Sequence, residues 1–173
     1  MYLKAITLLM GLTMFNLVNA ETLSVGQRAP EFELIDQVGN VHTLEDYRGQ
    51  WVILYFYPKN DTPGCTKQAC AFRDEYKTIT AKNTQVLGVS VDDQDSHKKF
   101  TEKFSLPFPL LADTDGAVAK QYGSLRSLGF MKLAKRHSFI INPQGEVAVI
   151  YRDVDPNNHS QEVLEDIDKL QSS

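Results

Sequence analysis

The chain has 173 residues, 42% of them hydrophobic, and a formal net charge of −4. This length and composition fit one domain built around a single core. Because the Lys and Arg residues are scattered through an acidic chain, the charge pattern gives no footprint for nucleic acid or an anionic membrane.

The first 20 residues differ from the rest of the chain. A single Lys4 precedes an apolar run that ends in Val18-Asn19-Ala20. The run is short for a membrane span, which needs about 20 residues, and small residues at its end are typical of a secretory signal peptide cut after Ala20. We therefore expect residues 1–20 to be a signal peptide and residues 21–173 to be exported to the periplasm or secreted, with no stable membrane association after cleavage. The alternative is an uncleaved N-terminal anchor.

The hydrophobic pattern of the remaining chain predicts alternating strands and helices. A hairpin is expected around the turn at 36–40, and further strands are expected at 51–57, 85–91, 110–112, 138–141 and 147–151. Helices are expected at 64–81, 96–104, 117–122 and 161–170. Residues 51–57 form an unbroken apolar run, as in a strand buried on both faces. The pattern predicts an α/β thioredoxin-like fold, with a central mixed sheet flanked by helices and an N-terminal hairpin.

Both cysteines of the chain lie in one segment, FYPKNDTPGCTKQAC, at residues 56–70. Thr62 stands where a helix N-cap belongs, and Pro63 follows at the first helical position. Cys65 therefore falls in the first turn, where free backbone N–H groups and the helix dipole favour a thiolate. The apolar stripe of this helix is expected to consist of Cys65, Ala69, Phe72, Tyr76 and Ile79.

The spacing of Cys65 and Cys70 argues against a permanent disulfide. In a regular helix their Cα atoms would lie roughly 8.6 Å apart, whereas a disulfide needs less than about 7 Å. A bond could form only if the first turns unwind, which suits a redox pair that alternates between two conformations. A structural disulfide, which an oxidising compartment would favour, remains the alternative. A metal site is a weaker interpretation of the two cysteines than a redox pair or a structural disulfide, because no second cysteine pair is present and the four histidines are scattered.

A reactive thiol also needs a pocket and a cation. Pro58 and Thr62 precede Cys65 closely, and the Thr62 hydroxyl could cap the helix or face a small polar ligand. The plain alternative is that Thr62 is an N-cap with no chemical role. Three arginines are candidate cations, and spacing does not choose among them: Arg73, Arg126 and Arg136.

Several motifs resemble those of a known family. PKNDTPGCT, at 58–66, resembles the peroxidatic motif Pro-x3-Thr-x2-Cys of the peroxiredoxins. Its continuation, TPGCTKQACAFRD, resembles the bacterioferritin-comigratory (Q-type) subgroup, in which a resolving cysteine follows five residues later. KRHSFIINPQG, at 135–145, resembles that family's Arg-x-Ser-Phe strand. Stretches at 29–36, 86–93 and 108–123 also match in order, so the likeness covers about residues 25–170.

The resemblance implies a role for each matching residue. Cys65 would be the peroxidatic thiolate and Cys70 the resolving thiol of an atypical two-cysteine enzyme. Thr62 would hydrogen-bond the peroxide, Pro58 would shield the site, and Arg136 would stabilise the thiolate and polarise the peroxide. The implied activity is reduction of hydrogen peroxide and organic hydroperoxides in antioxidant defence. A thioredoxin-like or other dithiol donor would recycle the enzyme, without metal, haem or flavin.

Two other functions remain open from sequence. A disulfide oxidoreductase or metallochaperone could share the fold, although such proteins usually carry Cys-x2-Cys or Cys-x3-Cys rather than Cys-x4-Cys. A non-catalytic exported domain could use the cysteines as a staple. We expect a monomer, because the cysteine pair lies within one chain. The segment 123–136 is shorter and more basic and apolar than in common family members, which makes it a candidate for shaping substrate or partner choice.

Overall fold

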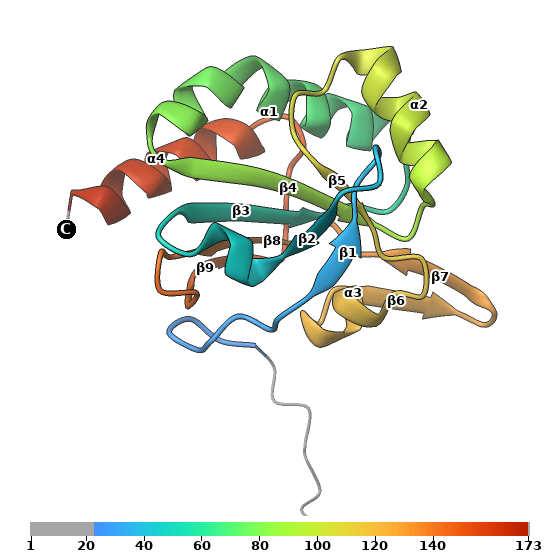
Figure 1. The fold of residues 1–173 in the computed structure, drawn as a ribbon, viewed down its shortest axis with the longest axis horizontal. Helices are drawn as coiled ribbons and strands as arrows, with labels where there is room; N and C mark the ends of the chain where they lie inside the picture. The colour runs from blue at the N-terminus through green and yellow to red at the C-terminus, as the bar shows by residue number, and fades with distance from the viewer. Residues whose placement is uncertain (1–22, 173) are drawn as a thin grey trace, which may run out of the picture.

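The computed structural model describes residues 23–172, so the predicted signal peptide lies outside the described part of the chain. Its centre is a five-stranded sheet in the order β5-β4-β3-β8-β9 (Figure 1). The strands are β3 (Trp51–Phe56), β4 (Thr84–Ser90), β5 (Leu110–Ala112), β8 (Ser138–Ile141) and β9 (Val147–Tyr151). β3, β4 and β5 run parallel, while β8 is antiparallel to both β3 and β9. The predicted mixed sheet is therefore confirmed.

The central strand β3 supplies side chains to two hydrophobic cores. Val52, Leu54 and Phe56 belong to the core on one face, whereas Ile53 and Tyr55 belong to the core on the other face. Successive side chains of a strand point to opposite faces. Its unbroken apolar sequence is explained by this burial on both sides.

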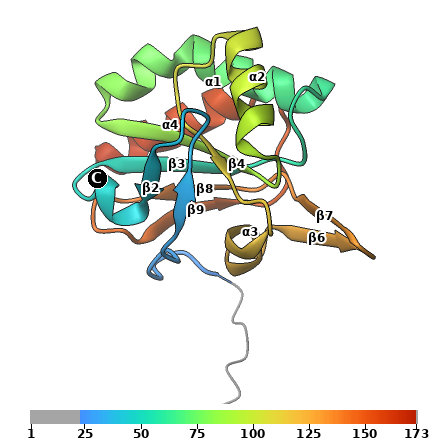
Figure 2. The same cartoon turned by 45° about the vertical axis from the view of Figure 1, so that its right-hand side comes forward.

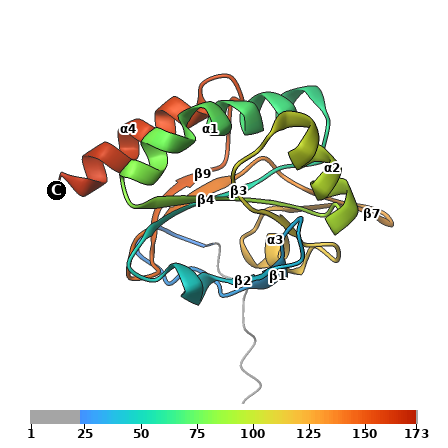
Figure 3. The same ribbon diagram turned by 45° about the horizontal axis from the view of Figure 1, so that its top comes forward.

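Helices cover both faces of the sheet (Figure 3). One face carries α1 (Pro63–Ala81), α2 (Gln94–Phe104) and α4 (His159–Gln171). The opposite face carries the hairpin of β1 (Glu33–Ile35) and β2 (Val41–Thr43), the 3-10 helix η1 (Leu44–Tyr47) and α3 (Ala117–Gln121). Within residues 23–172, no helix has the length and apolar character needed to cross a membrane.

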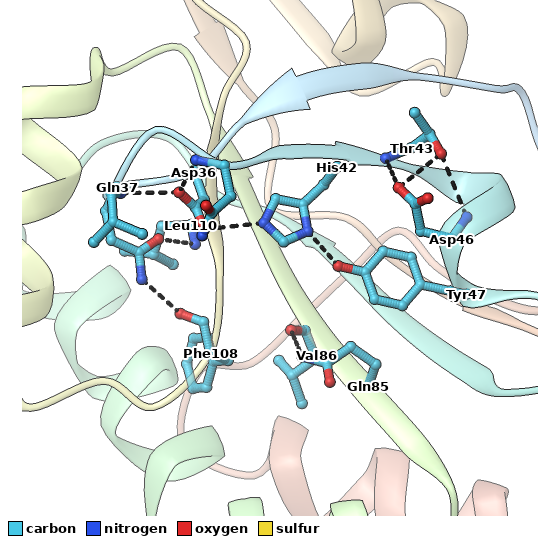
Figure 4. A network of polar contacts seen from close by, with 12 residues as sticks. Asp36, Gln37, His42, Thr43, Asp46, Tyr47, Gln85, Val86, Phe108 and Leu110 are labelled. Atoms are coloured by element: carbon cyan, nitrogen blue, oxygen red, sulfur yellow. Dashed lines mark hydrogen bonds and ion pairs between the residues drawn. The ribbon is translucent and has the colours of Figure 1, made fainter.

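A polar network fastens the N-terminal hairpin to the body of the protein (Figure 4). The buried carboxylate of Asp36 lies 2.9 Å from His42 Nε2, and His42 Nδ1 lies 2.5 Å from the Tyr47 hydroxyl. Burial opposes ionisation of Asp36, but hydrogen bonds from His42 and backbone N–H groups outweigh it and lower its pKa. Gln37 accepts from the backbone N–H of Leu110 at 2.8 Å, which ties the hairpin to β5.

Most predicted elements are present, with small shifts at their ends. The helix predicted from 96 begins at Gln94, because the Asp93 side chain accepts a hydrogen bond from Ser96 N and caps the helix two residues earlier. The last helix likewise begins at His159 instead of 161. Directly after β2, Leu44 opens the 3-10 helix η1.

Besides η1, one hairpin was not predicted. β6 (Leu125–Leu128) and β7 (Met131–Ala134) form a separate two-stranded antiparallel hairpin within the segment 123–136. Most of its side chains are exposed, so no alternation of buried and exposed positions marks these strands in the sequence.

Candidate active site

Cys65 lies in the first turn of α1, just beyond the carboxyl end of β3. Thr62 is the N-cap by its extended backbone (φ −94°, ψ 150°), and its carbonyl accepts from Thr66 N at 2.8 Å. The N-cap position of Thr62 is as predicted, but its hydroxyl makes no capping bond. It donates instead to the carbonyl of Lys59 at 3.0 Å. The hydroxyl is therefore turned back into the loop that precedes the helix.

The helix holds the two cysteines in different environments. Cys65 is 2% exposed and packs with Ala69 and Phe72 in the core under β3, whereas Cys70 is half-buried. Both thiols are free. The predicted apolar stripe of α1 is confirmed, with Tyr76 only partly buried. An unbroken helix from Pro63 to Ala81 contains both sulfurs, as the spacing argument requires for the reduced protein.

The sheet register brings Arg136 to Cys65. Ser138 of β8 pairs with Tyr55 of β3 in antiparallel register, so Arg136 lies beside the end of β3 where α1 begins. Its Nη2 donates to Cys65 Sγ at 3.3 Å, and its Nη1 donates to Gln68 Oε1 at 2.7 Å. A guanidinium fixed by these two contacts places a permanent positive charge beside the sulfur.

The structure thus distinguishes the three candidate arginines. Arg73 is bound to the carboxylate of Asp74 and to the carbonyl of Phe104, each at 2.8 Å. Arg126 lies on the exposed side of β6. Arg136 is the one of the three that contacts Cys65.

Gln68 is a site residue that the sequence reasoning missed. Its side chain is 1% exposed, its Oε1 binds Arg136, and its Nε2 has no partner in the described protein. The available clue was its position three residues after Cys65, on the same face of the helix.

Gly64 leaves room for the arginine. A Cβ at this position would lie 3.1 Å from Arg136 Nη2, closer than ordinary van der Waals contact. A side chain here would therefore push the guanidinium away from the sulfur.

A buried histidine lies behind this cluster. His159 Nε2 is 2.9 Å from the Ser138 hydroxyl, and its ring packs edge-on against Phe72. Burial lowers the pKa of His159, and the charge of Arg136 acts in the same direction, against the effect of Glu162. His159 therefore stays neutral near Arg136 and adds no second cation there.

A groove of about 510 Å³ adjoins the start of α1. Pro58 and Thr62 line one side, and the β7 residues Met131 and Leu133 line another. Lys59, Val91, Asp92 and Lys132 complete its wall. The structure thus places Pro58 and Thr62 together in this groove and Arg136 on Cys65. Among residues 23–172, no three His, Cys, Asp or Glu side chains cluster as metal ligands would.

A thioredoxin-like sheet with a buried, arginine-bound cysteine at the start of a helix defines a thiol-based redox protein. The chain belongs to the AhpC/TSA family, whose pattern it matches over residues 25–150. This family assignment agrees with the motifs around Cys65 and Arg136.

Individual relatives narrow the assignment. The chain is 41% identical over 147 residues to a Coxiella burnetii protein named peroxiredoxin bcp, covering 83% of this chain and 97% of that one. It is 42% identical over 149 residues to the chloroplastic peroxiredoxin Q of Oryza sativa subsp. japonica, covering 86% of this chain and 68% of that one. The structure of peroxidoxin BcpB from Mycobacterium tuberculosis superposes with a TM-score of 0.81 at 32% identity, covering 86% of this chain and 98% of that one.

The protein is therefore a peroxiredoxin of the bacterioferritin-comigratory (Q-type) group, and hence a thiol peroxidase. The thioredoxin-like fold is confirmed as well. A metallochaperone or a non-catalytic domain, the other functions compatible with the sequence, has no support from these relatives.

Proposed function

We propose that this chain reduces hydrogen peroxide and organic hydroperoxides through a disulfide cycle between Cys65 and Cys70. The observation that carries the proposal is the 3.3 Å contact between Arg136 Nη2 and Cys65 Sγ in the first turn of α1. A sulfur beside a guanidinium and the start of a helix is placed to act as a nucleophile.

In the first step, the Cys65 thiolate attacks the terminal oxygen of the hydroperoxide. An S–O bond forms as the O–O bond breaks, and the departing alkoxide or hydroxide takes up the proton that the thiol released. Arg136 donates to the oxygen on which charge develops. The Thr62 hydroxyl orients the peroxide, and Pro58 keeps bulk water from the sulfur. The products are a sulfenic acid on Cys65 and an alcohol or water.

In the second step, the first turns of α1 unwind and the Cys70 thiol condenses with the sulfenic acid. An S–S bond forms and one water molecule leaves. The need for unwinding follows from the regular helix, which separates the two sulfurs, and from the burial of Cys65. Unwinding must also break the contacts of Arg136 with Cys65 and Gln68.

In the third step, a thioredoxin-like or other dithiol donor reduces the disulfide by two thiol–disulfide exchanges. We place this cycle outside the cytoplasm, with residues 1–20 removed after Ala20, because of the leader-like sequence at the start of the chain. The enzyme would act as a monomer in antioxidant defence, since both cysteines of the cycle belong to one chain.

Intact-mass spectrometry of the exported protein after peroxide treatment tests the cycle. The wild type should lose two hydrogens as the disulfide forms, Cys70→Ser should gain one oxygen, and Cys65→Ser should stay unchanged. The same spectra report the N-terminus. A Cys65→Ser protein that still consumes peroxide at the wild-type rate would refute the role of Cys65.

A further inference from the structure

The β6–β7 hairpin extends beyond the body of the protein (Figures 1 and 2). Its tip carries three large apolar side chains in water: Leu128 is 49%, Phe130 99% and Met131 50% exposed. Gly129 forms the turn between the strands in a left-handed conformation (φ +63°), and beyond its chain neighbours no atom lies within 4 Å of where a Cβ would stand. A fully exposed phenylalanine beside two exposed aliphatic side chains is unusual for a surface that meets only water.

The charge around this tip differs from that of the whole protein. The segment 123–136 contains four basic residues and no acidic residue, whereas the complete chain has a net charge of −4. Arg136 is engaged at Cys65, but Arg126 and Lys135 are exposed, and Lys132 is exposed with its amine bound to the Asp115 carbonyl. Basic residues therefore flank the apolar tip.

This combination points to one kind of partner. An apolar tip with basic flanks is the usual signature of a segment that lies at an anionic lipid surface. A second copy of the chain fits less well, because a stable interface buries about 800 Å² on each partner and a narrow two-stranded finger offers little more than its tip. The negative charge of the remaining protein would be repelled by such a surface, so the hairpin would face the lipid.

We propose that the β6–β7 hairpin docks the protein reversibly on anionic lipid surfaces by inserting Leu128, Phe130 and Met131. This docking is peripheral and does not require the N-terminal segment. The net charge of the whole chain does not indicate this docking, because the acidic residues elsewhere outnumber the basic residues of the hairpin.

The position of the hairpin gives the docking a consequence for the enzyme. Met131, Lys132 and Leu133 of β7 line the same groove as Pro58 and Thr62. A hairpin inserted in lipid therefore brings the groove to the interface, where hydroperoxides of membrane lipids could enter. This part of the inference rests on the proposed peroxidase function.

Vesicle sedimentation of the full chain tests the docking directly. We expect binding to equimolar phosphatidylglycerol–phosphatidylcholine vesicles, weak binding to phosphatidylcholine alone, and release at high salt. Phe130→Ser should reduce binding about tenfold or more, as expected for losing one buried aromatic side chain. Val38→Ser is the matched control, because Val38 is 67% exposed in the β1–β2 turn, away from this hairpin. In Phe130→Trp, the added tryptophan emission should shift to the blue with vesicles.

Three results would overturn the proposal. Phe130→Ser could bind vesicles as well as the wild type, neutral vesicles could bind as well as anionic ones, or sedimentation equilibrium without lipid could reveal a dimer that Phe130→Ser abolishes. The last result would make a second copy the partner of the hairpin.

Activity separates this proposal from the peroxidase function. Phe130→Ser should slow reduction of phospholipid hydroperoxides in anionic vesicles but leave reduction of tert-butyl hydroperoxide in solution unchanged. If the wild type reduces neither substrate yet binds vesicles, the proposed function fails and the docking stands. If it reduces both without binding vesicles, the docking fails alone.

Discussion

Arg136 and Gln68 are bound to each other from different layers of the fold: Arg136 Nη1 donates to Gln68 Oε1 at 2.7 Å, and the second arm of the same guanidinium reaches Cys65 Sγ. Gln68 thus fixes the direction in which Arg136 points. Because Gln68 is buried and its partner is charged, removing this contact should cost free energy of folding.

Replacing Gln68 by Leu should slow oxidation of Cys65 about tenfold. The leucine fills a similar volume but leaves a guanidinium donor unpaired, at a cost of about 1–3 kcal/mol, and Arg136 loses its orientation. Gln68→Glu restores the acceptor but adds a negative charge near the sulfur. Oxidation of Cys65 in this variant should therefore reach its full rate only at a higher pH than in the wild type. Stopped-flow rates measured across pH check both variants, and a wild-type rate in Gln68→Leu would contradict this role.

Replacing Arg136 by Lys should slow peroxide attack at least about tenfold. Lysine keeps a charge but cannot reproduce the two-armed contact with Cys65 and Gln68, and loss of one preorganised donor typically costs about 10²–10³ in rate. Arg126→Lys, on the exposed side of β6, is the control. Equal loss in both variants would mean that Arg136 is not the activating cation.

Replacing Gly64 by Ala should lower activity without raising stability. Alanine inside a helix is about 0.5–1 kcal/mol more favourable than glycine, but here its Cβ would lie 3.1 Å from Arg136 Nη2 and displace the guanidinium from its partners, which offsets that gain. Urea unfolding and peroxide kinetics on the same preparation measure the two effects. Lys67→Ala, an exposed change in the same helix, should leave the oxidation rate unchanged.

Replacing Cys70 by Ser should preserve the first oxidation of Cys65 and block recycling by dithiols. The reason is that the sulfenic acid then has no thiol in the same chain with which to condense. Single-turnover consumption of peroxide should match the wild type, while steady-state turnover with a dithiol donor should be lost. Sustained turnover in this variant without added monothiol would remove Cys70 from the cycle.

Acid should destabilise the protein through His137. Burial, together with the charges of Arg152 and Lys135, lowers the pKa of His137 to about 4. An unfolded histidine titrates near 6.5, so below that pH the unfolded chain binds a proton that the folded chain does not. The stability that depends on neutral His137 is complete above about pH 6.5 and falls as the pH drops toward about 4.

Urea unfolding at several pH values from 7.5 to 4.5 measures this loss in the free energy of unfolding, because the range covers most of the interval between about pH 6.5 and 4. His137→Asn keeps an acceptor near the Ser124 hydroxyl, which contacts His137 Nδ1 at 3.1 Å, and should show a shallower loss of stability with acid. Parallel curves for the two proteins would contradict the assignment. His97 and His159 have lowered pKa values too, so the comparison relies on the difference between the curves.

The sequence was most informative where burial imposes a strict pattern. β3 and α1 were predicted closely, because one is buried on both faces and the other has a regular apolar stripe. The position of Cys65 in the first turn of α1 followed from Thr62 and Pro63. The sequence left the direction of the Thr62 hydroxyl open, because that direction depends on the loop that precedes the helix.

The local sequence pattern does not predict contacts between segments that are far apart in the chain. Arg136 was indistinguishable from Arg73 and Arg126 until the resemblance singled it out, and the register of β8 on β3 now gives the physical reason. Gln68 was passed over because a glutamine in a helix is usually exposed. The β6–β7 hairpin was missed because its strands are short and largely exposed.

The antiparallel pairing of β8 with β3 has a consequence for the chain before it folds. Cys65 and Arg136 are 71 residues apart in sequence, and only this pairing brings them together. In a newly made chain the two residues are therefore apart, and the guanidinium reaches the sulfur only as the sheet closes. In the proposed cycle, activation of Cys65 by Arg136 is thus a property of the completed sheet and not of the segment 56–70 alone.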